Sequence, residues 1–295
     1  MHKFQKIRRN KLIKWFAFLF MALNLAIITV TGLSYFYMSS MFERVVAEYN
    51  VSTVENVRTT LATNFSAGEK LAQEIYHTAE MGSLSKKSNL KDPSGYLAAG
   101  KLIDFIEYEL GSSSSLEGAY IYLSCSDTVI SEQGMFDARF FYESYAPHNE
   151  MTFDEWKSWI QERRQPFYQT ATLTYETYTA EVVEYYCPFN AYTDSSYGCV
   201  VLNYAPSLLL KPFDGGALLN SADIQIRYLP EQTQILSSGN TEINNYVYEQ
   251  DLKTGKTTLH STPFGKLIVI KQTSLDHNWE YIITLSANVF YERAN

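Results

Sequence analysis

The sequence predicts an α+β protein: an N-terminal transmembrane helix continues into a long stalk helix, and two antiparallel-sheet lobes follow. Three observations support this prediction. A run of 28 residues near the N-terminus has no charged side chain, and apolar residues at helical spacing follow it. Strands and short helices then occur in an order that is repeated once, without visible sequence identity between the two halves.

The apolar run, residues 15–42, is long enough to remain in a membrane. At about 1.5 Å per residue it spans roughly 42 Å, which exceeds the ~30 Å hydrocarbon core of a bilayer. A cleaved export signal usually has an apolar part of only about 7–15 residues, and no A-x-A site follows a short apolar core here. The run therefore predicts a signal anchor that stays in the membrane.

The distribution of charge predicts the orientation of this anchor. Residues 1–14 hold six lysines and arginines and no acid, so the positive-inside rule places them in the cytoplasm. Residues 43–295 are then extracytoplasmic. They contain all 32 acidic residues and the other 18 basic ones, which gives a net charge near −14. This excess argues against nucleic acid as a partner.

The stalk helix is predicted over residues 43–80, which contain no proline and only one glycine, Gly68. Its apolar stripe consists of Val46, Tyr49, Val54, Val57, Leu61, Phe65, Leu71 and Ile75. The spacing is too irregular for a strict heptad. Two interpretations stay open: the stalk packs against its own domain, or it forms a homodimer contact.

The membrane-distal lobe is expected over residues 81–210. A helix from about Pro93 to Leu110 precedes the strand "GAYIYLSC", the turn "SDT" and the returning strand "VIS". "TFDEWKSWIQERR" is predicted to be a short helix with a capping box formed by Thr152 and Glu155. Three strands follow: "FYQTATLTY", "AEVVEYYCPF" and "GCVVLNYA".

The membrane-proximal lobe, residues 211–295, repeats this order. "ADIQIRYL" and "QILSS" form a predicted hairpin, and "EINNYVYEQDL" a short helix or lid. "TTLHST", "KLIVIKQT" and "EYIITLS" are three further strands. We expect the helices of each lobe to cover one face of its sheet.

The three cysteines are too few to staple an exported domain of this size, so a hydrophobic core must hold it together. Cys187 and Cys199 are symmetric about residue 193 in a predicted hairpin that turns around Tyr192–Asp194. They are either a cross-strand disulfide or two small buried thiols.

Sequence patterns of catalysis and of metal binding are absent. "GYLAAGKL" has the spacing of a phosphate loop, but Leu102 stands where Ser or Thr should hold Mg²⁺. The five histidines have no metal-ligand spacing, and no G-x-S-x-G motif occurs. We therefore predict no enzymatic activity, no cofactor and no metal.

A basic N-terminus, a signal anchor, a stalk helix and two five-stranded lobes together resemble a double Cache (PAS-like) extracellular sensor region. Such regions head bacterial histidine kinases, chemoreceptors and membrane-bound AraC-type regulators, and the "TFDEWKSWIQ" helix is similar to the kinase and regulator members. The resemblance covers the whole chain and rests on architecture. It implies a small-molecule ligand under the helical cover of the distal lobe. It also implies a second membrane helix and an output domain beyond "NVFYERAN", where this chain ends.

The resemblance also implies ligand-binding residues. Amino-acid-binding members use an Arg-x-Trp-Tyr motif for the ligand carboxylate and an Asp on the last distal strand for its ammonium group. "ARFFYES" offers Arg139, Phe141 and Tyr142, with Phe in place of Trp, and Asn203 stands in place of the Asp. The tyrosine five residues before the Arg is replaced by Gly134. Arg139 is then the fork for a carboxylate-bearing ligand, and its alternative role is a surface salt bridge.

Two further aromatic residues are candidates for the pocket. Trp156 shares a helix face with Trp159, and either packs in the core or roofs the pocket. Tyr168 belongs to a set of strand tyrosines, of which some are expected to line a cavity. The rival to a sensor is a membrane-anchored interaction module that binds a protein or a cell-wall glycan without a pocket. A closed cavity near Arg139 would favour the sensor.

Overall fold

The computed structural model describes residues 2–190, 197–211, 222–250, 257–274 and 278–286. Its helices are α1 (His2–Tyr76), α2 (Ala79–Leu84), α3 (Pro93–Ser112), α4 (Ala138–Tyr145), α5 (Phe153–Glu162), α6 (Pro206–Leu210) and α7 (Thr241–Tyr248). Its strands are β1 (Leu116–Leu123), β2 (Thr128–Ser131), β3 (Gly134–Asp137), β4 (Phe167–Thr174), β5 (Thr179–Asn190), β6 (Tyr197–Tyr204), β7 (Asp223–Tyr228), β8 (Thr233–Ser238), β9 (Thr257–Thr262), β10 (Gly265–Thr273) and β11 (Trp279–Ser286). The chain divides into two units at Thr53.

The first unit, Met1–Thr53, contributes the N-terminal part of α1. Within it, Lys14–Met38 is the one helical segment of the described chain that is long and apolar enough to cross a membrane, with a mean hydropathy of 2.2. None of the side chains in this span is buried against protein. The predicted N-terminal apolar helix is confirmed.

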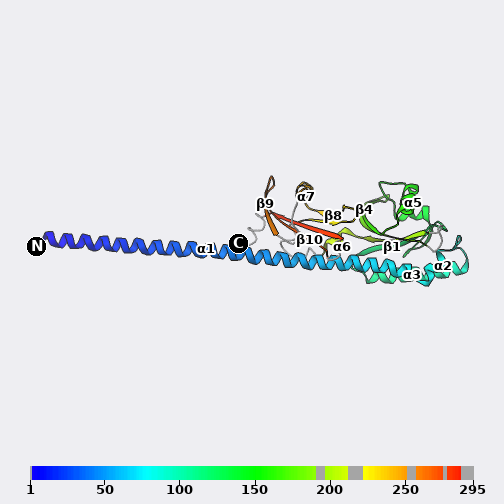
Figure 1. The fold of residues 1–295 in the computed structure, drawn as a ribbon, viewed down its shortest axis with the longest axis horizontal. Helices are drawn as coiled ribbons and strands as arrows, with labels where there is room; N and C mark the ends of the chain where they lie inside the picture. The colour runs from blue at the N-terminus through cyan, green and yellow to red at the C-terminus, as the bar shows by residue number, and fades with distance from the viewer. Residues whose placement is uncertain (1, 191–196, 212–221, 251–256, 275–277, 287–295) are drawn as a thin grey trace. The chain divides into compact units, whose positions relative to one another are not determined.

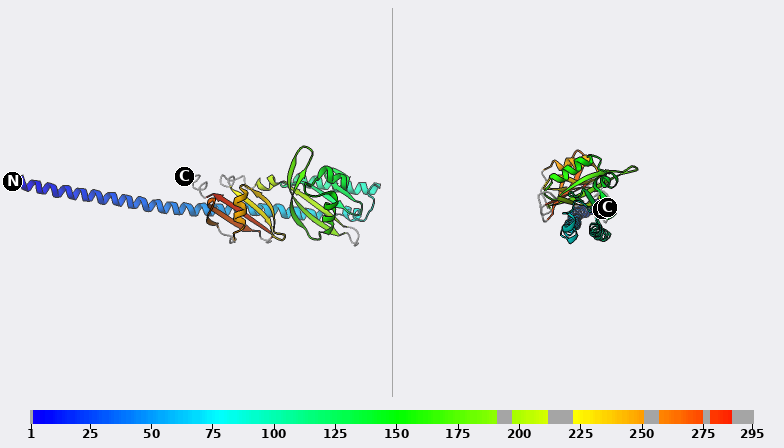
Figure 2. Two further views of the ribbon diagram at one scale, coloured as in Figure 1. Left: turned by 90° about the horizontal axis from the view of Figure 1, so that it is seen from above. Right: turned by 90° about the vertical axis from the view of Figure 1, so that its right-hand side faces the viewer.

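The second unit, Val54–Asn295, contains two antiparallel sheets. The first has the strand order β3-β2-β1-β6-β5-β4, and the second has the order β8-β7-β11-β10-β9. We call β1–β6 with α2–α5 the first lobe, and β7–β11 with α7 the second lobe (Figures 1 and 2). The α+β fold is confirmed, although the first sheet has six strands because β3 extends it beyond the predicted five.

Helices cover both faces of the first sheet, so the expectation of one covered face is wrong. Figure 1 shows α3 beside α1 under the sheet and α5 on its other side. The cause lies in the central strands: β1 and β6 are buried on both faces, with Ile121 and Leu202 facing α1 and α3, and Tyr122 and Val201 facing α4 and α5. A strand that is apolar on both sides needs a cover on each.

The C-terminal part of α1 packs against its own domain. Val57, Leu61, Phe65, Leu71 and Ile75 are all buried in a core that continues through both sheets. These five residues belong to the apolar stripe of the stalk, for which the sequence left two interpretations open. They pack against the protein's own domain. The side chains at 46, 49 and 54 lie outside the described ones, and a homodimer contact stays a prediction.

Aromatic rings join α1 to both lobes where the sheets meet. Phe65 of α1 stacks on Trp279 of β11 with 4.0 Å between ring centroids, and Tyr168 of β4 lies 4.6 Å from Trp279. Tyr228 of β7 lies 5.2 Å from Tyr168. Beside them, the Thr170 hydroxyl donates to the Ile235 carbonyl at 2.8 Å. We call Phe65, Tyr168, Tyr228 and Trp279 the aromatic joint.

The cysteines are free thiols. Strand β5 pairs Cys187 with Val200, and Pro188 with Cys199, so the two cysteines are one position out of register. Because neighbouring strand positions face opposite ways, Cys187 lies in the core under α1 and Cys199 in the core under α5. The disulfide alternative is wrong, and both thiols pack as small buried groups. The turn proposed for Tyr192–Asp194 lies outside the described residues.

Candidate ligand-binding site

A cavity of about 190 Å³ lies in the first lobe, on the face of the sheet that α4 covers. Its lining comes from four strands, from α4 and from three connections. The lining residues are Glu117, Gly118, Ala119, Tyr120, Glu132, Gln133, Phe141, Tyr145, Ala146, Leu173, Tyr175, Tyr178, Ala180, Val182 and Asn203.

A β-bulge and a glycine open the floor of this cavity. The pairing of β1 with β6 skips from Leu116 to Gly118, which leaves Glu117 unpaired. Such a bulge changes the direction in which the side chains of the strand point. At Gly118 a Cβ atom would meet only Asn203 and Glu132 side chains, at 3.9 Å. The missing side chain at Gly118 is therefore part of the cavity volume.

Two carboxylates belong to the cavity wall. Glu117 is exposed at the bulge, and Glu132 is half-buried in the two-residue turn between β2 and β3. Glu132 Oε2 accepts a long hydrogen bond of 3.5 Å from the Ala119 amide. Burial raises the pKa of Glu132 because a desolvated carboxylate loses its hydration. None of the lining residues is Lys, Arg or His.

Asn203 contributes an unused acceptor. It lies on β6 opposite Gly118 of β1 and Glu184 of β5. Its side-chain Oδ1 is buried and has no hydrogen-bond partner among the described residues. Because Asn203 lines the cavity, its Oδ1 is available to accept a hydrogen bond from a molecule there.

Aromatic side chains form the remaining wall. Phe141 packs on Tyr120 with ring centroids 5.0 Å apart, and it stacks on Tyr145 at 5.5 Å. Tyr175 and Tyr178 stack on each other at 4.6 Å in the connection between β4 and β5. The Tyr175 hydroxyl donates to the Tyr145 carbonyl at 3.1 Å, which ties this connection to the end of α4.

A buried polar network stands behind the cavity. Glu184 of β5 is fully buried, and His148 Nε2 lies 3.0 Å from its Oε2. Tyr186 and Gln169 donate to the same oxygen at 2.7 Å and 2.9 Å. The His148 ring also stacks on Tyr142 of α4. This network fixes the end of α4 to the sheet beneath it.

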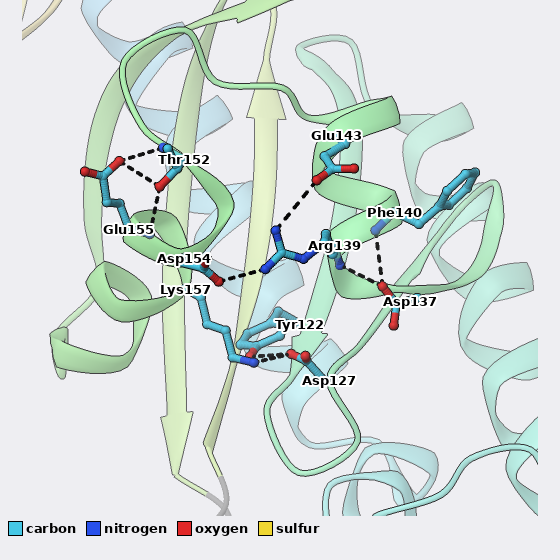
Figure 3. A network of polar contacts seen from close by, with 10 residues as sticks. All are labelled: Tyr122, Asp127, Asp137, Arg139, Phe140, Glu143, Thr152, Asp154, Glu155 and Lys157. Atoms are coloured by element: carbon cyan, nitrogen blue, oxygen red, sulfur yellow. Dashed lines mark hydrogen bonds and ion pairs between the residues drawn. The ribbon is translucent and has the colours of Figure 1, made fainter.

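Of the predicted site residues, Phe141 and Asn203 line the cavity and Arg139 does not. The Arg139 side chain is 53% exposed and turns toward α5, where it binds Asp154 at 2.9 Å, with Glu143 at 3.8 Å (Figure 3). Its guanidinium also lies over the Phe153 ring at 4.6 Å. Arg139 thus has the surface salt bridge that the sequence left as its alternative.

The other three predicted residues are buried away from the cavity wall. Tyr142 donates to the Met151 carbonyl, and Trp156 packs against Tyr122 and Tyr142 in the core under α5. Trp156 therefore takes the core-packing role. Tyr168 lies on the opposite face of the sheet, in the aromatic joint, where its hydroxyl donates a hydrogen bond to Glu69 Oε1 at 3.0 Å.

The resemblance to the amino-acid motif fails at Gly134 for a backbone reason. Its φ of 141° lies in a region that residues with a Cβ rarely adopt, so a tyrosine would strain the start of β3. The residues that sequence reasoning missed are Glu117, Gly118, Glu132 and Tyr145, whereas Tyr175 and Tyr178 belong to the tyrosines of which some were expected to line a cavity. A signal for Gly118 existed, because alternation along β1 places it on the same face as Tyr120 and Tyr122. Among the described residues, no cluster of His, Cys, Asp and Glu suits a metal ion.

Comparisons with known proteins show the fold. No protein-family model matches the chain, and no curated protein does. The ligand-binding domain of Mlp24, solved with asparagine, matches at 12% identity with a TM-score of 0.52, over 86% of this chain and 98% of that one. The ligand-binding domain of the Campylobacter jejuni chemoreceptor Tlp3, in complex with L-valine, matches at 9% identity and a TM-score of 0.52, over 85% and 97%.

A third structure is the extracellular domain of vpHK1S-Z8, a protein described as a histidine kinase. It matches at 9% identity and a TM-score of 0.55, over 85% of this chain and 98% of that one. The chain therefore shares the fold of sensor domains from chemoreceptors and kinases, as the double Cache resemblance implied. These neighbours are ligand-binding and sensory domains and not catalytic ones.

Proposed function

We propose that this chain is the extracytoplasmic sensor region of a transmembrane signalling receptor, and that it binds a small molecule in the first-lobe cavity. The observation that carries the proposal is the cavity itself, a partly open pocket between α4 and the sheet of a fold that sensor domains share. In this proposal the N-terminus is cytoplasmic, residues 43–295 are outside, and the lobe boundaries are those predicted from the sequence.

The route of the signal follows from the packing of α1. This helix buries Leu61 and Phe65 against both sheets, and the same helix contains the apolar segment Lys14–Met38. A ligand that changes the first lobe therefore acts on residues of α1. The rival proposal, a docking module for a protein or a glycan, does not need the cavity.

The test is a thermal-shift screen of the full chain in detergent with amino acids, carboxylates, amines, sugars and phosphates. A ligand at a hundredfold excess over its Kd should stabilise the folded state by about 2.7 kcal/mol. Gly118→Leu fills the cavity and should abolish the shift. Gly100→Leu is the control, because a Cβ at Gly100 meets no atom within 4 Å. If no compound gives a shift that depends on Gly118, the docking module is favoured.

The same screen tests the finer prediction that Arg139 binds the carboxylate of the ligand. Arg139→Ala should weaken binding of such a ligand by about 30-fold or more, since loss of an Arg from a buried charge pair removes about 2–5 kcal/mol. A ligand whose shift survives Arg139→Ala and disappears in Gly118→Leu would reject Arg139 as its partner and keep the cavity.

A further inference from the structure

The cavity has an uncompensated negative wall. Glu117 and Glu132 both line it, and none of its lining residues carries a positive charge. The uncharged Asn203 adds a buried oxygen that only a donor can satisfy. A molecule in the cavity would therefore face hydrogen-bond acceptors and no positively charged donor.

Positive side chains close to the cavity are engaged elsewhere. Arg139 pairs with Asp154 and Glu143 on the outer surface, as Figure 3 shows. Lys157 of α5 binds Asp127 at 2.7 Å (Figure 3). Behind the wall, His148 is committed to a third carboxylate, that of Glu184. An anionic ligand would therefore enter a negative site without a partner.

The aromatic wall suits a cation as well. Phe141, Tyr145, Tyr175 and Tyr178 surround the same space, and ring faces attract cations within about 6 Å. Carboxylates combined with ring faces are the chemistry that recognises alkylammonium groups. The volume of about 190 Å³ exceeds the roughly 150 Å³ of an engineered cavity that holds benzene, so a compact organic molecule fits.

We infer that the first-lobe cavity takes a small organic ammonium cation, with Glu132 and Glu117 facing its charge, Asn203 Oδ1 accepting from it and the four aromatic rings around it. The inference rests on the proposed function and specifies the ligand class. It departs from the carboxylate that the sequence predicted, because the only arginine of that motif lies outside the cavity.

The experiment compares molecules of matched shape and different charge on the full chain in detergent at neutral pH. One set is choline, its uncharged carbon isostere dimethylbutanol and the carboxylate dimethylbutanoate. The other is butylammonium, butanol and butanoate. Binding is measured by calorimetry and thermal shift. In at least one set the cation should bind at least tenfold more tightly than the neutral and the anionic compound.

Two variants locate the charge. Glu132→Gln should weaken binding of the preferred cation by about 30-fold, the usual effect of removing one partner of a buried charge pair. Asn203→Asp should strengthen it. Glu181→Gln is the matched control, because Glu181 is exposed on β5 and does not line the cavity. Thermal unfolding in the absence of any probe compound checks that each variant folds. If Glu132→Gln does not fold, the Asn203→Asp variant still tests the inference.

Equal binding within both sets, tighter binding of an anion, or a cation affinity that neither variant changes would overturn the inference. The proposed function fails differently. In that case no compound of the wider screen gives a shift that Gly118→Leu removes. A carboxylate or sugar whose shift is removed by Gly118→Leu would uphold the sensor and reject the cation.

Discussion

Glu184 shows how a single buried charge is maintained in the first lobe. Burial by itself would raise the pKa of this carboxyl, but the charge of His148 and the hydrogen bonds that Glu184 accepts outweigh burial and hold the pKa below 4.5. A carboxyl whose pKa is lower in the folded state than in the unfolded one stabilises the fold above the unfolded value. That contribution is lost as the pH falls from about 4.5 through the lower folded pKa.

Glu184→Gln should therefore reduce the free energy of unfolding by about 3–5 kcal/mol at neutral pH, because it leaves His148 without its buried partner. The same variant should flatten the loss of stability below about pH 4.5. Chemical denaturation of the full chain across this pH range measures both effects. Glu181→Gln, three residues earlier on β5 and exposed, should change neither. An unchanged acid profile in Glu184→Gln would assign the acid sensitivity to other carboxyls.

At the scale of elements, α1 approaches the first sheet closely because Gly68 has no side chain. A Cβ at Gly68 would lie 1.8 Å from the Tyr204 hydroxyl and 3.4 Å from Leu202. Tyr204 is fully buried among the rings of Phe65 and Tyr168, so it has no free space to move into. The single glycine of the predicted stalk thus sets the distance between helix and sheet.

Gly68→Ala should destabilise the protein, although alanine favours a helix over glycine by about 1 kcal/mol. Overpacking a close-packed core typically costs about 1–3 kcal/mol, and here the whole of α1 would have to shift. Gly82→Ala is the control, because a Cβ at this exposed position on α2 meets no atom within 4 Å. Thermal unfolding compares the two. A Gly68→Ala protein as stable as the parent would show that the helix and sheet separate easily.

Elements with a clear period or cap could be predicted from the sequence, and elements without one could not. The capping box of α5 is formed by Thr152 and Glu155 as expected, and the two meanders follow from runs of apolar and aromatic residues separated by turn residues. Strand β3 and helix α4 were missed because both are short: β3 has four residues, and the helical spacing of Ala138, Phe141 and Tyr142 extends over only two turns. A signal for α4 was present in Asp137, whose side chain caps the amides of Arg139 and Phe140.

The candidate site was predictable only where a residue lies on a predicted strand or matches the spacing of a motif. Asn203 follows from its place on the last distal strand, and Phe141 was found through the motif spacing of "ARFFYES". Glu117 reaches the cavity through a bulge, and Glu132 through a two-residue turn. Neither feature has a sequence period. Arg139 matched a motif by spacing, but spacing does not determine which way a long side chain turns, and Asp154 lies within its reach.

For the whole molecule, the asymmetry of charge is the basis of the proposed orientation in the membrane. Six basic residues precede the apolar segment and a net charge near −14 follows it. In the proposed orientation, which rests on the positive-inside rule, residues 43–295 are translocated. The net negative charge of residues 43–295 and the two carboxylates of the cavity have the same sign, so both favour a cation over an anion.

Fusion of a phosphatase that is active only outside the cytoplasm after Asn295 should give enzyme activity in whole cells. The same reporter joined after Lys14, before the apolar segment, should be inactive. A fluorescent protein that matures only in the cytoplasm should give the opposite pattern. Fluorescence from the fusion after Asn295 would place the lobes in the cytoplasm and contradict the orientation.

The stacking of Trp279 on Phe65 gives the protein an internal optical probe. The chain has four tryptophans: Trp15, Trp156, Trp159 and Trp279. Two of them, Trp156 and Trp159, belong to α5, while Trp279 is fully buried where α1 meets both sheets. Indole emission shifts in wavelength and intensity with the polarity and the quenching groups around the ring. A chain that keeps only Trp279 would therefore report, in real time and without a dye, whether an event in the first lobe reaches α1.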